Sequence, residues 1–193
     1  MGRVTSRILV DANVLYSRTL RDWLLLIQSE TPGMFRTCWT EDILAETVHH
    51  IRRNNPLLDG GAVTVVRDRM VAAMSERIEA FVVKEFAPLT DEHDLHVHAA
   101  AVDGQVSLVL TNDKGFLDLP DAVTDMLPYE VIDADSLFVL IDDSSPETVR
   151  RVTAQVWDHL RKKDPAADVA QLLVQAGCPR FAQRVRRHQR ELR

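Results

Sequence analysis

The chain has 193 residues and a formal net charge of -6, and 46% of its residues are hydrophobic against 27% charged. These values are typical of one globular domain, or of one domain with a small appendage, and exclude a disordered, collagen-like or rod-like coiled-coil protein. No apolar run approaches the roughly 18 residues of a membrane-spanning helix, and no basic-apolar signal sequence is present, so we expect a cytoplasmic protein without membrane association. Two cysteines, Cys38 and Cys178, are too few for a disulfide framework.

The charge is unevenly distributed. Residues 147–193 contain 11 Lys and Arg against 5 Asp and Glu, which leaves 12 basic and 24 acidic residues in 1–146. An acidic body therefore carries a basic C-terminal segment. Carboxylates that bind a divalent metal would explain the acidic body, and the basic segment suits RNA, an acidic partner or the acidic body itself. Ordinary solvated faces would give the same totals.

Apolar strands alternate with helical stretches through most of the chain. We expect strands at 7–10, 34–39, 81–83, 106–111 and 129–132. Helices are expected at 18–28, 40–50, 62–80, 91–103, 120–126 and 135–141. This alternation predicts an α/β fold with a central, mostly parallel sheet. After a linker at 142–146 only helical patterns follow, broken near Pro165 and Gly177, which predicts a domain over 1–142 and a helical extension over 143–193.

Two of the predicted strands end at an aspartate. Asp11 follows the strand at 7–10, and Asp113 follows the strand at 106–111. Because ligands of open parallel sheets bind outside the carboxyl ends of the strands, both side chains are expected to face one crevice. Either residue alone is equally well explained as a turn or helix cap, but converging carboxylates need a cation, a hydrogen-bonding turn or water.

Two further carboxylates are ambiguous from the pattern alone. Asp94 lies in the first turn of its helix with Asp91 and Glu92, where negative charge complements the helix dipole without any function. Glu46 falls opposite the apolar stripe of its helix, so the periodicity indicates a solvated residue.

Four short segments, taken in order, resemble a known family. They are VDANVL at 10–15, ILAE at 43–46, DEHDLHVHAAA at 91–101 and VLTNDKGF at 109–116. In this order, and on these predicted elements, they resemble the PIN-domain ribonucleases, in particular the VapC-like toxins of bacterial toxin–antitoxin pairs, over about residues 7–141. The resemblance implies a three-layer PIN-like domain, a metal-dependent endoribonuclease activity and a cognate antitoxin protein as partner.

The resemblance also assigns roles to individual residues. It implies a catalytic, metal-binding quartet of Asp11, Glu46, Asp94 and Asp113. The positions that would support this quartet are Asn13, Thr111 and Asp91. Hard oxygen ligands select Mg²⁺ or Mn²⁺, and attack by a metal-activated water predicts 5′-phosphate and 3′-hydroxyl ends, with either one or two metal ions.

Other residues near these motifs have competing interpretations. Arg18, Arg21 and Lys114 are candidate substrate-binding residues that contact RNA phosphates, but each is also explained as an exposed surface cation. The three histidines His93, His96 and His98 lack the i, i+4 spacing of a helical zinc pair.

Two apolar and basic stretches leave alternatives open. The apolar residues from Trp23 to Ile27 indicate either core or a groove for an antitoxin segment. The arginines between residues 180 and 190 form a basic helix that suits RNA, an acidic partner or the chain's own acidic body.

We therefore predict a metal-dependent endoribonuclease, acting as the toxin of a toxin–antitoxin system on an RNA that the sequence does not distinguish among tRNA, rRNA and mRNA. A homodimer is left open. One rival is a non-catalytic PIN-like protein that binds RNA or regulates through it. Another is a receiver-like signalling domain, whose acidic strand ends hold Mg²⁺ beside a phosphorylated aspartate, although its strand-end lysine is not evident in this sequence.

Overall fold

The computed structural model describes residues 5–89 and 94–192. The chain folds into two compact units, and each is described by itself below. The first unit, here called the sheet unit, comprises Met1–Tyr16 and Gly33–Ile132. The second, here called the helical unit, comprises Ser17–Pro32 and Asp133–Arg193. The division at 142/143 expected from the sequence falls inside a helix of the second unit and stays a prediction.

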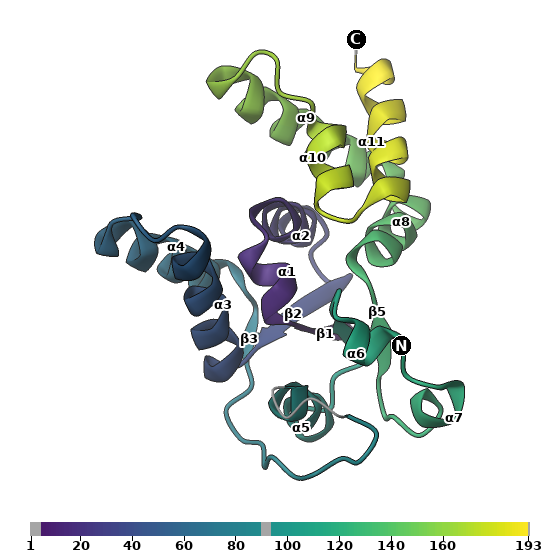
Figure 1. The fold of residues 1–193 in the computed structure, drawn as a ribbon. Coiled ribbons are helices and arrows are strands. Elements are labelled where there is room, and N and C mark those ends of the chain that lie inside the picture. Colours follow the sequence, from purple (N-terminus) through teal and green to yellow (C-terminus); the bar gives the residue numbers. More distant parts are fainter. Residues whose placement is uncertain (1–4, 90–93, 193) are drawn as a thin grey trace. The chain divides into compact units, whose positions relative to one another are not determined.

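A five-stranded sheet forms the centre of the sheet unit (Figure 1). Its strands are β1 (Ser6–Val10), β2 (Phe35–Trp39), β3 (Glu76–Arg77), β4 (Leu108–Leu110) and β5 (Glu130–Ile132). They lie in the order β3-β2-β1-β4-β5, and every pairing between them is parallel. The predicted α/β class is therefore confirmed, and the sheet expected to be mostly parallel is parallel throughout the described residues.

Helices cover both faces of this sheet. The helices of the sheet unit are α1 (Ala12–Tyr16), α3 (Glu41–Asn54), α4 (Gly60–Ala73), α5 (Leu95–Asp103), α6 (Lys114–Leu117) and α7 (Asp121–Thr124). Figure 1 shows α5 on one side of the sheet and α1 on the other, as the three-layer arrangement requires. Because both faces are covered, the central strand β1 buries Ile8, Leu9 and Val10 in succession instead of alternating apolar and polar residues.

The strand predicted at 81–83 is wrong. The chain is irregular there, and Val82 and Val83 are 64% and 50% exposed. The edge strand is β3, which begins soon after α4 ends at Ala73 and pairs with β2. Arg7 of β1 holds the charged Glu76 of β3 in place by an ion pair of 2.5 Å. The available edge of β2 therefore decided which residues became a strand, and the β-propensity of the two valines did not.

The helical unit contains five helices within its described residues. They are α2 (Arg18–Glu30), α8 (Ala134–Ser144), α9 (Pro146–Lys163), α10 (Val169–Gln175) and α11 (Pro179–Glu191). The breaks expected near Pro165 and Gly177 separate the last three. Phe181 lies at the centre of an aromatic cluster, with ring centroids 5.0 Å from Trp23 and 5.1 Å from Phe138. Trp23 is fully buried, as the core interpretation of its apolar stretch requires.

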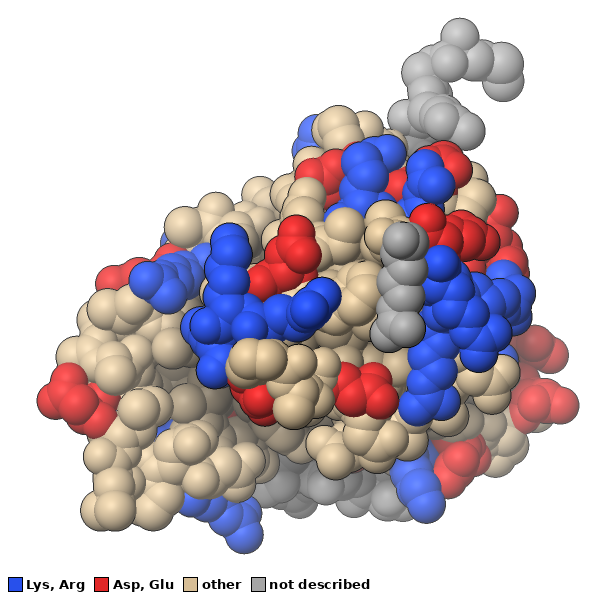
Figure 2. Space-filling view, turned by 90° about the horizontal axis from the view of Figure 1, so that it is seen from above, with Lys and Arg blue, Asp and Glu red and all other residues tan. Residues whose placement is uncertain are grey.

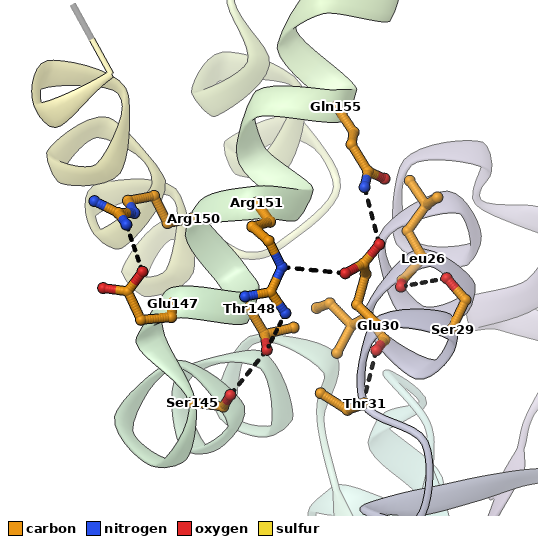
Figure 3. Close-up of polar contacts among 11 residues, drawn as sticks. Leu26, Ser29, Glu30, Thr31, Ser145, Glu147, Thr148, Arg150, Arg151 and Gln155 are labelled. Atoms are coloured by element: carbon orange, nitrogen blue, oxygen red, sulfur yellow. Dashed lines mark hydrogen bonds and ion pairs between the residues drawn. The ribbon is translucent and has the colours of Figure 1, made fainter.

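Polar contacts tie α2 to α9 (Figure 3). Glu30 accepts a hydrogen bond of 3.0 Å from Gln155 and one of 3.2 Å from Arg151. These two donors hold the pKa of the Glu30 carboxyl below its usual value. Arg151 also donates to the Thr148 hydroxyl at 3.1 Å, and that hydroxyl accepts from Ser145 at 2.9 Å. The last turn of α2 is thereby fixed to the first three turns of α9.

The basic residues of α11 fall into two groups. Arg180 forms an ion pair of 2.9 Å with Asp135, and Arg184 forms one of 2.7 Å with Asp143, so both are paired with carboxylates of α8. Arg186, Arg187 and Arg190 are exposed, and the paired Arg180 is also 59% exposed. Figure 2 shows basic and acidic side chains interleaved over the face seen from above. Part of the basic segment is therefore neutralised by acidic residues of its own unit.

Truncation of Phe181 tests the aromatic cluster. We expect Phe181→Ala to lower the free energy of unfolding by about 3–5 kcal/mol, because it leaves a cavity between Trp23 and Phe138. Urea denaturation followed by circular dichroism measures the change. Leu140→Ala is the matched control, because Leu140 is 55% exposed on α8 and its truncation should cost less than about 0.5 kcal/mol. Equal losses in both variants would contradict the assignment of this core.

Candidate functional site

The sheet order creates a switch point between β1 and β4. The chain leaves β1 towards β2 on one side and later returns to β4 and β5 on the other. Ligands of open α/β sheets bind beyond the carboxyl ends of the strands at such a point. Asp11 follows β1 there, and Asp113 follows β4 by three residues. The backbone N–H of Asp11 donates to the carbonyl of Leu110 at 3.0 Å, so the two strand ends predicted to share a crevice are adjacent.

The Asp11 carboxylate is buried and hydrogen-bonded through both oxygens. Its Oδ1 accepts from the backbone N–H of Ala12 at 2.6 Å, and its Oδ2 accepts from Asn13 at 2.6 Å and from Thr111 at 2.7 Å. The Thr111 hydroxyl in turn accepts from Asn13 at 2.8 Å and from the backbone N–H of Asp113 at 2.9 Å. Asn13 and Thr111 therefore link Asp11 to the turn that carries Asp113.

Glu46 of α3 lies close enough to Asp11 to affect its pKa. Burial raises the pKa of Asp11 above its usual value, and the charge of Glu46 raises it further. Hydrogen bonds from Thr111 and Ala12 and the proximity of His96 act in the opposite direction. The helix pattern indicates a solvated Glu46, and its side chain is indeed 38% exposed, but it also lies close enough to Asp11 to repel it. The packing of α3 against α1 brings Glu46 close to Asp11, and helix periodicity alone cannot predict this packing.

Two imidazoles flank Glu46. His50 Nε2 lies 3.4 Å from its Oε1, and His96 Nε2 lies 3.9 Å from its Oε2. The sequence analysis missed both as site residues, because it weighed His96 only as a zinc ligand. His50 was detectable in principle, since it follows Glu46 by four residues on the same helix, whereas His96 comes from α5 and left no local signal.

Asp94 and Asp113 converge on a glycine. Asp113 precedes α6, and its Oδ1 accepts from the backbone N–H of Gly115 at 2.5 Å. A Cβ atom on Gly115 would lie 2.8 Å from Asp113 Oδ1 and 2.9 Å from Asp94 Oδ2. The two carboxylate oxygens therefore lie no farther apart than the sum of these distances. Gly115 permits this close approach because it has no side chain.

The remaining predicted site residues are placed as follows. Lys114 is exposed beside Asp113. Arg18 and Arg21 belong to α2 of the helical unit; Arg18 lies 3.6 Å from Asp22, and Arg21 lies 3.8 Å from it. Arg21 is largely buried, and this burial lowers the pKa of its guanidinium. Asp91 lies outside the described residues.

His98 makes contacts that stabilise the fold around α5. It points to Tyr129, with Nδ1 2.8 Å from the phenol oxygen, and its ring stacks on Phe86 with centroids 4.2 Å apart. Burial lowers the pKa of His98. His98 therefore fastens the irregular segment containing Phe86 to α5.

The donor chemistry of the four carboxylates suits a hard divalent cation. All four offer oxygen ligands, which Mg²⁺ and Mn²⁺ prefer. A cation would offset the burial of the Asp11 charge and its repulsion by Glu46, and it would balance the two negative charges that face Gly115. In residues 5–89 and 94–192, however, no three carboxylate, imidazole or thiol side chains are grouped closely enough to hold a metal ion as they stand. The carboxylates form two pairs, Asp11 with Glu46 and Asp94 with Asp113, joined through Thr111.

The largest described features outside the site do not include its carboxylates. An open hollow of about 620 Å³ lies between α6, α7 and β5, and none of the four carboxylates lines it. Among the described helices, none combines the length and apolarity needed to cross a membrane. Comparisons with protein-family models, with curated proteins and with solved structures find no match to this chain. Any function proposed for this chain therefore depends on the residues of the site.

The raised pKa of Asp11 gives a pH-dependent prediction. A carboxyl whose pKa is raised by folding contributes stability below its unfolded pKa, near 3.8, and loses it as the pH rises through the folded value. Without divalent cations, the free energy of unfolding of the wild type minus that of Asp11→Asn should therefore fall as the pH rises above the unfolded pKa of the carboxyl, near 3.8. Urea titrations at several pH values measure this difference. A difference that is constant or increases with pH would contradict the burial and repulsion described for Asp11.

Proposed function

We propose that the chain is a metal-dependent endoribonuclease. The observation that carries the proposal is the convergence of Asp94 and Asp113 on Gly115, beside the buried Asp11 network at the switch point of the sheet. Like-charged carboxylates that face one site are stabilised when they share a cation. A divalent cation held beyond the carboxyl ends of β1 and β4 suits hydrolysis of a phosphodiester.

The proposed chemistry divides the work among residues of the sheet unit. Asp11, Glu46, Asp94 and Asp113 would hold Mg²⁺ or Mn²⁺. When bound, such an ion supplies a nucleophilic water near neutral pH and neutralises charge on the scissile phosphate. Thr111 and Asn13 keep Asp11 in one orientation through their hydrogen bonds to its Oδ2. Lys114 is exposed one residue after Asp113 and would contact an RNA phosphate.

We also propose that the nuclease is the toxin of a toxin–antitoxin pair. The support for this setting is the resemblance of four sequence segments to VapC-like toxins, and the proposed partner is a cognate antitoxin protein. Expression in bacterial cells tests it: growth arrest by the wild type but not by Asp113→Asn supports the role. Cleavage in vitro without arrest would leave a nuclease that is not a toxin.

Removal of single carboxylate charges tests the catalytic proposal. We expect Asp11→Asn and Asp113→Asn to abolish cleavage of total RNA and tRNA, because each removes a metal ligand while keeping the side-chain shape. Cleavage by the wild type should need Mg²⁺ or Mn²⁺, stop with chelator and leave 5′-phosphate ends. Gel analysis of the products measures it.

Asp118→Asn is the matched control, because Asp118 is exposed at the end of α6 and should tolerate the change. Metal-dependent cutting by both folded site variants would refute the site. Tight RNA binding by the wild type without turnover would favour the alternative, a non-catalytic PIN-like RNA-binding or regulatory protein.

Gly115→Ala tests the convergence of the two carboxylates directly. Its methyl group would press on Asp94 and Asp113 and force them apart, so we expect at least a 10-fold loss of cleavage, as is usual when groups around a metal site are displaced. The melting temperature should change little, because Gly115 is exposed in a short helix.

Gly60→Ala is the control for the glycine substitution itself, since nothing lies within 4 Å of a Cβ atom there. Full activity of Gly115→Ala would show that the close approach at Gly115 has no role in the reaction.

A further inference from the structure

The two imidazoles beside Glu46 come from different elements and face opposite oxygens of its carboxylate. His50 comes from α3 and lies nearest Oε1, whereas His96 comes from α5 and lies nearest Oε2. Helix geometry explains His50, because residues four apart lie on one face. Nothing in local geometry requires His96 to face the same carboxylate.

His96 is held in an unfavourable state. Its Nε2 atom is buried and has no hydrogen-bond partner in the described part of the chain. A distance of 3.9 Å to Glu46 Oε2 is too long for a hydrogen bond. A buried polar atom without a partner loses its hydration without compensation, and such atoms are rare in folded proteins. A shift of about 1 Å would close this distance to the usual hydrogen-bond length.

Glu46 is the carboxylate that most needs support from neighbours. Its side chain is 38% exposed, and it repels Asp11, whose pKa it raises. Asp11 itself is fixed by three hydrogen bonds. Without a further contact, repulsion would turn the more mobile Glu46 away from Asp11 and towards solvent.

Both histidines are well placed to hold Glu46. The ring of His50 lies against Tyr16 of α1, with centroids 4.9 Å apart, so its position is linked to the helix that follows Asp11. His96 is anchored by its helix, in which Val97 and the alanines at 99–101 are buried. The imidazoles therefore belong to rigid elements, whereas the carboxylate between them is on a flexible side chain.

We infer that His96 and His50 are positioning residues that bracket Glu46, each donating from Nε2–H to one carboxylate oxygen and directing Glu46 towards Asp11. This inference rests on the proposed nuclease function and names a part of its site that the acidic quartet does not contain. If Glu46 shared a cation with Asp11, a small movement of its carboxylate would bring Oε2 within hydrogen-bond distance of His96 Nε2. His96 thus acts through Glu46 and has no contact with the RNA.

The experiment separates the N–H donor of His96 from its shape. His96→Phe keeps a flat ring and removes the donor, whereas His96→Gln removes the ring and keeps an N–H donor at a similar reach. His49→Gln is the matched control, because His49 is exposed on α3 next to His50. Two measurements are made on each full-length variant: binding of Mn²⁺ alone, by electron paramagnetic resonance, and cleavage of tRNA as a function of Mn²⁺ concentration.

We expect His96→Phe to raise the Mn²⁺ concentration for half-maximal binding and for half-maximal cleavage by about 10- to 100-fold, the usual effect of removing a group that orients a metal ligand. His96→Gln should recover most of this loss, and His49→Gln should match the wild type. The KM for tRNA at saturating Mn²⁺ should stay unchanged in all three, which a loss of RNA contact would not produce, and circular dichroism checks that each variant is folded.

Each other outcome overturns the inference in a recognisable way. Wild-type Mn²⁺ affinity in His96→Phe would show that Glu46 needs no bracket. An equal loss in His96→Phe and His96→Gln, with both variants folded, would show that the N–H donor is not what matters. A wild-type protein that neither binds Mn²⁺ nor cleaves RNA would refute the proposed function itself, and the bracket with it.

Discussion

The candidate site depends on the cost of placing a carboxylate at the buried end of a central strand. Asp11 is 6% exposed, yet it sits where β1 ends and where the sheet reverses its order. A buried carboxylate persists only when its oxygens are hydrogen-bonded or paired with a cation. Ala12, Asn13 and Thr111 donate hydrogen bonds to the Asp11 carboxylate. The Thr111 hydroxyl also accepts from the backbone N–H of Asp113, which extends the network to the turn after β4. The positions of the other site residues follow from this anchor.

Like charges around that anchor set the second constraint. Burial and the charge of Glu46 raise the pKa of Asp11. One oxygen of Asp94 and one of Asp113 lie within 3 Å of the position that a Cβ atom on Gly115 would take. Several carboxylate charges in one place are unfavourable in the metal-free protein and become favourable when the carboxylates share a cation. The proposed metal chemistry and the inferred imidazole bracket are two consequences of the same repulsion. The metal ion would supply positive charge, and the imidazoles would orient the Glu46 side chain, which would otherwise turn towards solvent.

The helical unit shows how composition can mislead about charge. The last 47 residues are strongly basic in sequence, but Arg180 and Arg184 are paired with carboxylates of α8, and His188 Nε2 lies 2.6 Å from the buried Asp142. The basic character of α11 therefore serves in part to attach it to α8. A count of charges cannot distinguish a surface that recruits RNA from a helix that neutralises its neighbour, because the count contains no distances.

The sequence by itself determined the α/β class, most strands and helices, and the placement of Asp11 and Asp113 at adjoining strand ends, because these follow from local periodicity and from the geometry of parallel sheets. It failed at 81–83, where strand identity depended on the free edge of β2. It also did not find His96 as a neighbour of Glu46, because these residues come from different helices. Which side chains face one another across α1, α3 and α5 is a property of packing between distant segments, and only the tertiary structure decides it.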